Sequence, residues 1–291
     1  MILVFGGNGQ LGRELTIRAR AGGVGLTALG HNEADIADTA AVERAVVATL
    51  PSFIVNAAAY NAVDAAEDDE AAAMRGNAEG PRVLAEAAAR HGVPLVHVST
   101  DYVFDGEKGS AYVEDDPIGP LGAYARSKAA GEAAVRRATG MHYILRTAWL
   151  YSIHGSNFVK TMVKLARERP ALKAADDQTG SPTAARDLAD AILLLASRGQ
   201  GRFGTFHVAG TGAATRHQWV SAIVAAQAPF TGKTPPVLAV PASTFPAHAR
   251  RPRYTALDCG KFEATFGFHA RAWQDAVRDT VAEMFTKGEA A

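Results

Sequence analysis

Ile2-Leu-Val-Phe-Gly6-Gly-Asn-Gly9-Gln-Leu-Gly12 opens the chain with a short apolar run, glycines at every third position and the start of a helical pattern. A strand-to-helix turn around a pyrophosphate needs a tight bend, a close backbone approach and close packing of helix on strand, and glycine suits each task. The helix N-terminus adds free N–H groups and a partial positive charge. The stretch therefore predicts a dinucleotide-binding turn, with a ligand-free strand, turn and helix as the simpler alternative. The cofactor residues expected here are Gly6, Gly9, Gln10, Leu11 and Gly12.

The first half of the chain alternates between apolar, β-branched runs and Ala-, Glu- and Arg-rich stretches with helical spacing. Continuous apolar strands joined by crossover helices are typical of a parallel sheet covered on both faces, and right-handed crossovers make it doubly wound. We therefore predict an α/β fold with a Rossmann-like parallel sheet that binds ligands at the C-terminal ends of its strands. Strands are expected at Ile2–Phe5, 25–29, Phe53–Asn56, 95–98 and 143–146, and helices at Gln10–Ala21, 39–50, 66–91 and 124–139.

The second half is less regular and predicts a smaller, mostly helical C-terminal substrate lobe. Pro and Gly concentrate between Pro229 and Pro252, around one short strand at Val237–Val240. Helices are expected at 156–168, 185–197, 216–227 and 272–285. We expect a dinucleotide-binding domain over residues 1–150, with a return segment near 183–210, and a mainly substrate-binding lobe over residues 151–291.

Composition excludes several classes of protein. The 291 residues carry 30 basic and 30 acidic side chains, so a zero net charge argues against nucleic acid or an anionic membrane as a partner. Hydrophobic residues make up 48% and charged residues 21%, which excludes a disordered chain. No apolar run approaches the roughly 20 residues that span a bilayer. The N-terminus lacks the basic region of a signal peptide and Cys259 is the single cysteine, so a cytoplasmic location is expected.

The GxxGxxG spacing resembles the extended branch of the short-chain dehydrogenase/reductase superfamily. An acidic residue for the adenosine ribose is expected about 20 residues after the turn, but Gly30 and His31 stand there and no arginine replaces it. The choice between NADH and NADPH therefore stays open. Asp35 and Ile36 are expected to flank the adenine, although Asp35 could equally belong to a solvated loop.

A run of small residues follows the third expected strand. It comprises Asn56, Ala57, Ala58 and Ala59. Small side chains let a backbone approach a planar ligand, so we expect the cofactor to lie against this run. Simple close packing is the alternative.

Tyr124 and Lys128 are four residues apart at the start of an expected helix, which places both side chains on one face. A nearby ammonium favours the phenolate, so we expect Lys128 to lower the pKa of Tyr124 and make it a general acid/base. Thr100 ends the fourth expected strand and can orient a substrate carbonyl beside Tyr124, with Ser99 as the competing candidate. Together these residues predict carbonyl reduction or alcohol oxidation with a nicotinamide cofactor.

Longer motifs resemble the dTDP-4-dehydrorhamnose reductase family over nearly the whole chain. In the first half of the chain these are Asn56-Ala-Ala-Ala-Tyr-Asn-Ala-Val-Asp64, Ser99-Thr-Asp-Tyr-Val-Phe-Asp-Gly106, Pro120-Leu-Gly-Ala-Tyr-Ala-Arg-Ser-Lys128 and Arg146-Thr-Ala-Trp-Leu-Tyr151. In the second half they are Asn157-Phe-Val-Lys-Thr-Met162, Asp177-Gln-Thr-Gly-Ser-Pro-Thr183, Phe206-His-Val-Ala-Gly210 and Arg250-Arg-Pro252. The resemblance implies reduction of the C4 ketone of dTDP-4-dehydro-L-rhamnose with NADPH or NADH. Thr100, Tyr124 and Lys128 fall on the catalytic positions. Tyr124 and Lys128 also fall on cofactor-binding positions, where Lys128 would reach the nicotinamide ribose.

The resemblance also implies the substrate-binding residues. Trp149 falls on the sugar-pocket position, although a buried structural tryptophan is the alternative. Paired guanidiniums suit a diphosphate, although Arg250 and Arg251 could also form a solvated basic turn. The full implied set is Val63, Asp64, Thr100, Asp101, Trp149, Asn157, Arg250 and Arg251.

Three residues depart from the family's usual pattern and leave the exact sugar open: Asn61, Gly122 and Ala125. A sugar-nucleotide dehydratase usually carries Asp-Glu after the catalytic threonine, whereas Asp101 and Tyr102 follow Thr100 here. An epimerase keeps the same catalytic residues and stays an alternative. So does a non-catalytic role like that of the regulatory subunit of methionine adenosyltransferase, which resembles this family. Some family members bind Mg2+ at a dimer contact, so the resemblance allows Mg2+ and a homodimer, but no residue here has metal-ligand spacing.

Overall fold

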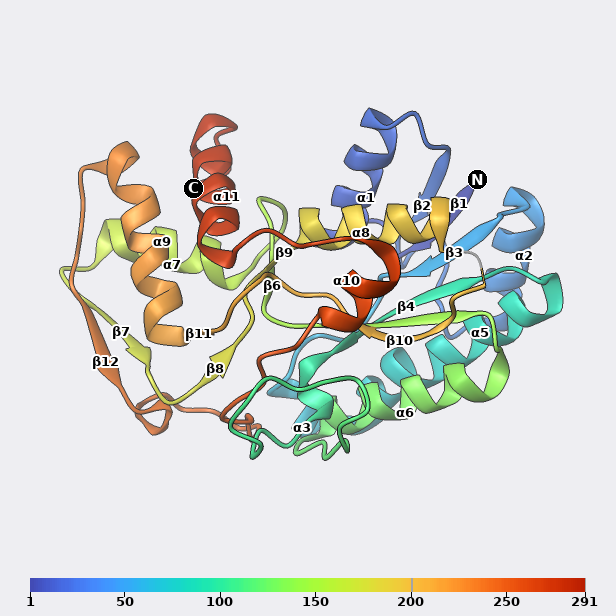
Figure 1. Cartoon of the computed structure of the whole chain (residues 1–291), viewed down its shortest axis with the longest axis horizontal. Helices are drawn as coiled ribbons and strands as arrows, with labels where there is room; N and C mark the ends of the chain where they lie inside the picture. The colour runs from blue at the N-terminus through green and yellow to red at the C-terminus, as the bar shows by residue number, and fades with distance from the viewer. Residues whose placement is uncertain (200, 291) are drawn as a thin grey trace.

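A six-stranded parallel sheet forms the centre of the larger lobe in the computed structural model, which describes residues 1–199 and 201–290 (Figure 1). The strand order is β10-β5-β4-β3-β1-β2, and every neighbouring pair is parallel. This confirms the predicted doubly wound, Rossmann-like α/β fold. The strands are β1 (Ile2–Phe5), β2 (Leu26–Leu29), β3 (Phe53–Asn56), β4 (Leu95–Thr100), β5 (His142–Thr147) and β10 (Gly204–His207).

Helices cover both faces of this sheet, which is why its strands read as continuous apolar runs. In β1, Ile2 and Val4 pack against α1 and α8, whereas Leu3 and Phe5 face the opposite core. Figure 1 shows α1 and α8 on one side of the sheet and α5 and α6 on the other. The covering helices are α1 (Gln10–Ala21), α8 (Ala185–Arg198), α2 (Thr39–Thr49), α5 (Gly80–His91) and α6 (Ala123–Ala138).

The single helix expected over 66–91 is wrong, because the chain breaks it into four pieces. Asp69 ends the first piece and caps the second, since its carboxylate accepts a hydrogen bond from the Ala72 N–H. Asn77 then binds the backbone of Tyr60 through both ends of its amide, which holds a π-helical turn against the loop after β3. The pieces are α3 (Ala65–Asp68), α4 (Glu70–Met74), the π-helical turn η1 (Arg75–Glu79) and α5.

The smaller lobe is mostly helical, as predicted, and also holds strand pairs that the sequence did not indicate. Strands of two to four residues are too short to show a periodic pattern, so only β12 was expected. The helix expected over 216–227 continues to Thr231 through Pro229. The helices are α7 (Phe158–Glu168), α9 (Arg216–Thr231) and α11 (Trp273–Thr286), and the paired strands are β6 (Leu150–Tyr151) with β9 (Thr183–Ala184), β7 (Leu172–Ala175) with β12 (Val237–Val240), and β8 (Thr179–Gly180) with β11 (Ala214–Thr215).

After building part of the smaller lobe, the chain crosses back to the larger one. There α8 packs on α1 and β10 pairs with β5. The boundary at residue 150 itself stays a prediction. In the two described ranges, no helix is both long and apolar enough to cross a membrane.

Candidate active site

The turn between β1 and α1 depends on glycines at two points. Gly6 has φ +90°, and a Cβ there would lie 2.5 Å from the Ala58 nitrogen. A Cβ at Gly12 would lie 2.4 Å from the Gly6 carbonyl oxygen. Gly9 is different: it caps α1 with φ −76°, and a Cβ would meet only the Gly6 oxygen at 3.3 Å. The turn therefore brings α1 close to the sheet and leaves Gly9 facing open space.

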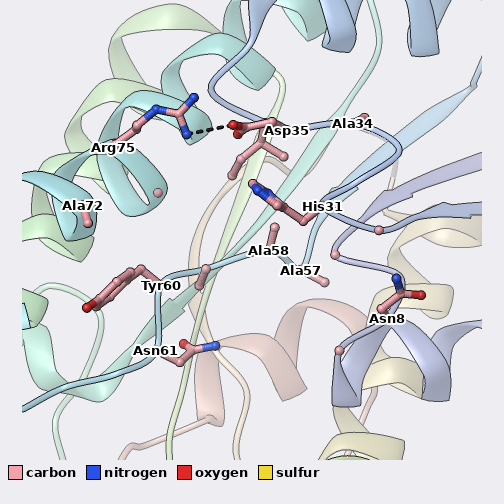
Figure 2. Close-up of a pocket in the computed structure, with 16 residues that line it drawn as sticks. Asn8, His31, Ala34, Asp35, Ala57, Ala58, Tyr60, Asn61, Ala72 and Arg75 are labelled. Atoms are coloured by element: carbon pink, nitrogen blue, oxygen red, sulfur yellow. Dashed lines mark ion pairs between the residues drawn. The ribbon is translucent and has the colours of Figure 1, made fainter. Parts of the chain in front are cut away.

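A cavity of about 480 Å³ lies outside this turn (Figure 2). Of the expected cofactor residues, its lining includes Gly6, Gly9, Asp35, Ile36, Ala57, Ala58 and Ala59. Arg75 also lines it and pairs with Asp35 at 2.7 Å, the dashed contact in Figure 2. Partial burial opposes ionisation of Asp35, but the Ala37 N–H and Arg75 outweigh it and lower the pKa of its carboxyl.

Glu33 is an acidic residue near the end of β2 that sequence reasoning missed. Its carboxylate accepts a hydrogen bond from the Gly30 N–H at 2.7 Å. The motif places an acid directly after the strand, at Gly30 or His31, whereas the loop here turns back and brings in a carboxylate three residues later. The spacing of Gly30 and Glu33 along the chain did not predict this hydrogen bond.

A second cavity, of about 300 Å³, brings the three expected catalytic residues together. β4 supplies Thr100 at its C-terminal end, and the first turns of α6 supply Tyr124 and Lys128. The two cavities share Gly9 and the small residues after β3, so they adjoin each other. Expected site residues that also line the second cavity are Gln10, Leu11, Ala57, Ala58, Ala59, Asp101 and Trp149.

The expected lowering of the Tyr124 pKa is wrong, because burial outweighs any effect of Lys128. Burial raises the pKa of the Tyr124 phenol well above its ordinary value, and the nearby Thr100 hydroxyl opposes this only in part. The Lys128 ammonium instead donates to the Val98 carbonyl at 2.7 Å. Burial lowers the pKa of Lys128 to about 8. Desolvation thus favours the neutral form of both groups.

The structure distinguishes Ser99 from Thr100, the two candidates at the end of β4 for the hydroxyl that orients the substrate carbonyl. Ser99 donates to the buried Glu132 carboxylate at 2.7 Å, so its hydroxyl has a structural partner. Thr100 donates to Asp101 at 3.0 Å and lies nearer the phenol of Tyr124. Asp101 also accepts from Thr255, and burial raises the pKa of its carboxyl to about 6.

Trp149 stands in a strained backbone conformation beside the reactive cavity. Its φ is +45°, which a non-glycine residue rarely adopts. The indole stacks on Trp219 with ring centroids 5.2 Å apart. Gly180 makes room for it, because a Cβ there would lie 2.5 Å from the indole. The packing therefore fixes a flat aromatic face next to the catalytic residues.

A third cavity, of about 760 Å³, adjoins these aromatic residues in the smaller lobe. Val63 and Arg251 line it, as expected for substrate-binding residues. Asp64 pairs with Arg251 at 2.6 Å and accepts hydrogen bonds from two backbone N–H groups, so it orients the arginine. Tyr102 and Arg216 also line this cavity, and sequence reasoning missed both.

Three expected substrate residues, Asp64, Asn157 and Arg250, line none of these three cavities. Arg250 is exposed. Asn157 caps α7 by accepting from the Lys160 N–H, and its amide donates to Gln10 at 3.0 Å. Asn56 is buried beside the cavities. Its amide nitrogen lies 3.1 Å from His97 Nδ1, and its amide oxygen accepts a hydrogen bond from the Ala58 N–H.

The departures at Asn61 and Gly122 have structural counterparts, and Ala125 is buried in α6. Asn61 lines the first two cavities. Gly122 begins α6, and Glu67 takes the space beside it: a Cβ at 122 would lie 2.5 Å from the Glu67 carboxylate, which accepts the Ala123 N–H. Within residues 1–199 and 201–290, no group of three or more His, Cys, Asp or Glu side chains could hold a metal ion.

Comparisons with known proteins agree with this arrangement. Residues 1–286 match the family model described as the RmlD substrate binding domain. A dTDP-4-dehydrorhamnose reductase of Sinorhizobium fredii is 39% identical over 99% of both chains. A solved dTDP-4-dehydrorhamnose reductase of Clostridium acetobutylicum superimposes with a TM-score of 0.92, at 35% identity, over 97% of this chain and 99% of the other. Another, from Bacillus anthracis and in complex with NADP, gives 0.90 at 32% identity, over 97% and 98%.

Proposed function

Because this chain belongs to the RmlD family, we propose that it reduces the C4 ketone of dTDP-4-dehydro-L-rhamnose to give dTDP-L-rhamnose. It is an oxidoreductase, and we propose NADPH or NADH as the hydride donor. The observation that carries the proposal is the meeting of Thr100, Tyr124 and Lys128 in one cavity that continues into the nucleotide turn.

The residues of the turn fit a dinucleotide. Gly9 caps α1 and leaves the N-terminal N–H groups of the helix accessible for the pyrophosphate, and Ala57, Ala58 and Ala59 offer a flat, small-residue surface. Bound here, the reduced nicotinamide supplies a hydride to the ketone carbon. The first cavity then holds the adenosine, with Asp35 and Ile36 beside the adenine.

The catalytic residues complete the reduction on oxygen. Thr100 orients the ketone by a hydrogen bond, and Tyr124 donates its hydroxyl proton as negative charge develops there. Lys128, in its charged form, stabilises the resulting phenolate and contacts the ribose. One hydride and one proton are thus added across the C=O bond to give the alcohol.

The proposed substrate contacts come from both lobes. Trp149 covers one face of the deoxyhexose, while Asp101 lies beside Thr100 at the reacting end. Val63 and Arg251 belong to the cavity for the nucleotide, and Asp64 orients Arg251. Asn157 and Arg250 remain predictions based on family membership.

The test is an assay of the purified protein with dTDP-4-dehydro-L-rhamnose, with NADPH and NADH compared side by side. We expect stoichiometric oxidation of both, with kcat/KM values within about a hundredfold of each other, because neither the ribose hydroxyl nor its phosphate has a dedicated partner at Gly30 and His31. An epimerase would interconvert sugars without net oxidation. A regulatory subunit would bind NADPH without turnover, and either result would replace the reductase proposal.

Family membership also supports three further proposals that no single residue of this chain carries. These are Mg2+ binding, a homodimer and a cytoplasmic location. Light scattering with and without EDTA tests the first two together. A monomer whose mass and activity do not respond to EDTA or added Mg2+ would remove both.

A further inference from the structure

Arg216 is a cation in the binding region that none of the sequence motifs assigned. It is the first residue of α9, directly after the capping residue Thr215. Its side chain reaches the wall of the 760 Å³ cavity, where Tyr102 and Arg251 also lie. The cationic lining residues are Arg169, Lys173, Arg216 and Arg251, and no Asp or Glu occurs among the described residues that line this cavity. The cavity is therefore suited to an anion.

The Arg216 guanidinium is held by aromatic rings instead of a carboxylate. Its central carbon lies 3.6 Å from the centroid of the Trp149 ring, with Phe158 and Trp219 slightly further away. In the described part of the chain, no carboxylate lies within ion-pair distance of it, whereas Arg251 pairs with Asp64. Arg216 is half-buried, and a partly desolvated guanidinium without an anionic partner costs free energy. Stacking through one face leaves its in-plane N–H groups able to donate to an anion.

Tyr102 connects this cation to the reacting group. Its ring meets the Tyr124 ring edge-on, with centroids 6.2 Å apart. Both Arg216 and Arg251 approach the Tyr102 hydroxyl. Trp149 lines the reactive cavity on one side while Arg216 stacks on it. An anion bound by Arg216 and Arg251 would thus be separated from the substrate ketone by one layer of aromatic side chains.

From this geometry we propose that Arg216 and Arg251 together bind the diphosphate of the sugar nucleotide, and that the Arg216 stack positions Trp149 against the sugar. This inference rests on the proposed function, because it assumes a nucleoside diphosphate sugar. It assigns the second guanidinium to Arg216 instead of the exposed Arg250. The apolar remainder of the cavity, which includes Phe158, Met162 and Phe245, accommodates the planar base.

Calorimetry with dTDP and with thymidine, on the NADPH-loaded protein, tests this assignment. Arg216→Met keeps an extended side chain over Trp149 but removes the charge, and Arg216→Lys restores the charge without the planar fork. We expect the Kd for dTDP to rise about 10- to 100-fold in Arg216→Met, the worth of a hydrogen-bonded charge, and less in Arg216→Lys. Thymidine carries the base without phosphates, so its Kd should change by less than about threefold.

The matched control is Arg278→Ala, an exposed arginine on α11 whose loss should leave the dTDP Kd unchanged. NADPH binding reports that each variant is folded. A wild-type Kd for dTDP in Arg216→Met, or an equal loss of thymidine and dTDP binding, overturns the inference even if the wild type reduces the keto sugar. A wild-type protein that neither binds dTDP nor reduces the sugar overturns the proposed function itself.

Discussion

Tyr124 and Lys128 lie one helical turn apart, and burial acts on both in the same sense, toward the neutral form. It raises the pKa of the phenol and lowers that of the ammonium to about 8. A protonated phenol is what reduction requires, since Tyr124 must donate a proton. The charge of Lys128 is therefore the state that ordinary pH can change.

Replacing Tyr124 by Phe tests the proton donor. The ring and its edge contact with Tyr102 remain, so the Kd for NADPH should stay unchanged. The value of kcat should fall by roughly 10²–10⁴, the usual contribution of a positioned acid. Thr100→Val should cost less, because one orienting hydrogen bond is lost while proton transfer survives. Turnover near the wild-type value in Tyr124→Phe would contradict the mechanism.

The pH profile tests Lys128. Its pKa in the folded chain is about 8, below the ordinary value of 10.5, so its ammonium form is lost as pH rises through about 8. The value of kcat/KM for reduction should therefore fall above that pH. Lys128→Met should be slower throughout and lack this decline, whereas Thr100→Val should keep it. The same alkaline decline in Lys128→Met would assign it to another group.

At the scale of elements, two contacts place the catalytic residues. In the turn after β1, Gly6 and Gly12 allow α1 to pack closely against the sheet. The C-terminal end of β4 is fixed to α6, because Ser99 of β4 and Arg146 of β5 both bind the Glu132 carboxylate of α6. The helix that carries Tyr124 is thus tied to the strand that carries Thr100.

Gly9 and Gly12 should respond differently to the same substitution. Gly9→Val places a branched side chain where the pyrophosphate approaches, so NADPH affinity should collapse while the melting temperature changes little. Gly12→Val would put a Cβ 2.4 Å from the Gly6 oxygen, so it should also destabilise the fold. Calorimetry and thermal unfolding of both variants separate the effects. Unchanged NADPH affinity in Gly9→Val would move the cofactor away from this turn.

Removing the Glu132 charge should cost about 3–5 kcal/mol of the free energy of unfolding, because Glu132→Gln leaves the buried Arg146 without its ion pair. Burial opposes ionisation of Glu132, but Arg146 and Ser99 outweigh it and lower its pKa to about 2 from 4.5. The stabilisation is therefore complete above pH 4.5 and is lost as pH falls toward about 2.

Urea unfolding at several pH values measures this effect, and Glu132→Gln should flatten the acidic part of the profile. The control is Glu79→Gln, whose exposed pair with Arg82 should contribute less than about 0.5 kcal/mol. An equally small loss in both variants would show that the buried pair does not stabilise the fold.

The three cavities described above lie at different places in the molecule. The first two adjoin each other and follow the C-terminal edge of the sheet, whereas the third is lined mainly by the smaller lobe, with Val63 and Tyr102 from the larger one, and shares no lining residue with them. Residues of both lobes therefore line the third cavity.

Separate cavities predict additive stabilisation by the two ligands. NADPH and dTDP, each at about 100 times its Kd, should each add about 2.7 kcal/mol to the free energy of unfolding, and together about twice that. Thermal unfolding with each ligand and with both measures this. In Arg216→Met the dTDP increment should shrink while the NADPH increment stays. A combined effect no larger than either alone would show that the ligands compete for one site.

Local spacing was enough to predict the parallel sheet, the glycine turn after β1 and the shared helix face of Tyr124 and Lys128. The strands read as apolar runs because both faces are buried, and Tyr124 and Lys128 share a face because of the helical repeat. The longer motifs pointed to the family. Each of these features depends on residues close together in the chain.

Features that depend on distant contacts were decided only by the tertiary structure. α9 brings Arg216 onto Trp149 from 67 positions away, and no local repeat records that approach. The π-helical turn at Arg75–Glu79 depends on Asn77 meeting Tyr60, and the pKa of Tyr124 depends on its burial. A sequence pattern registers neighbours along the chain, whereas desolvation and packing act between whatever the fold places side by side.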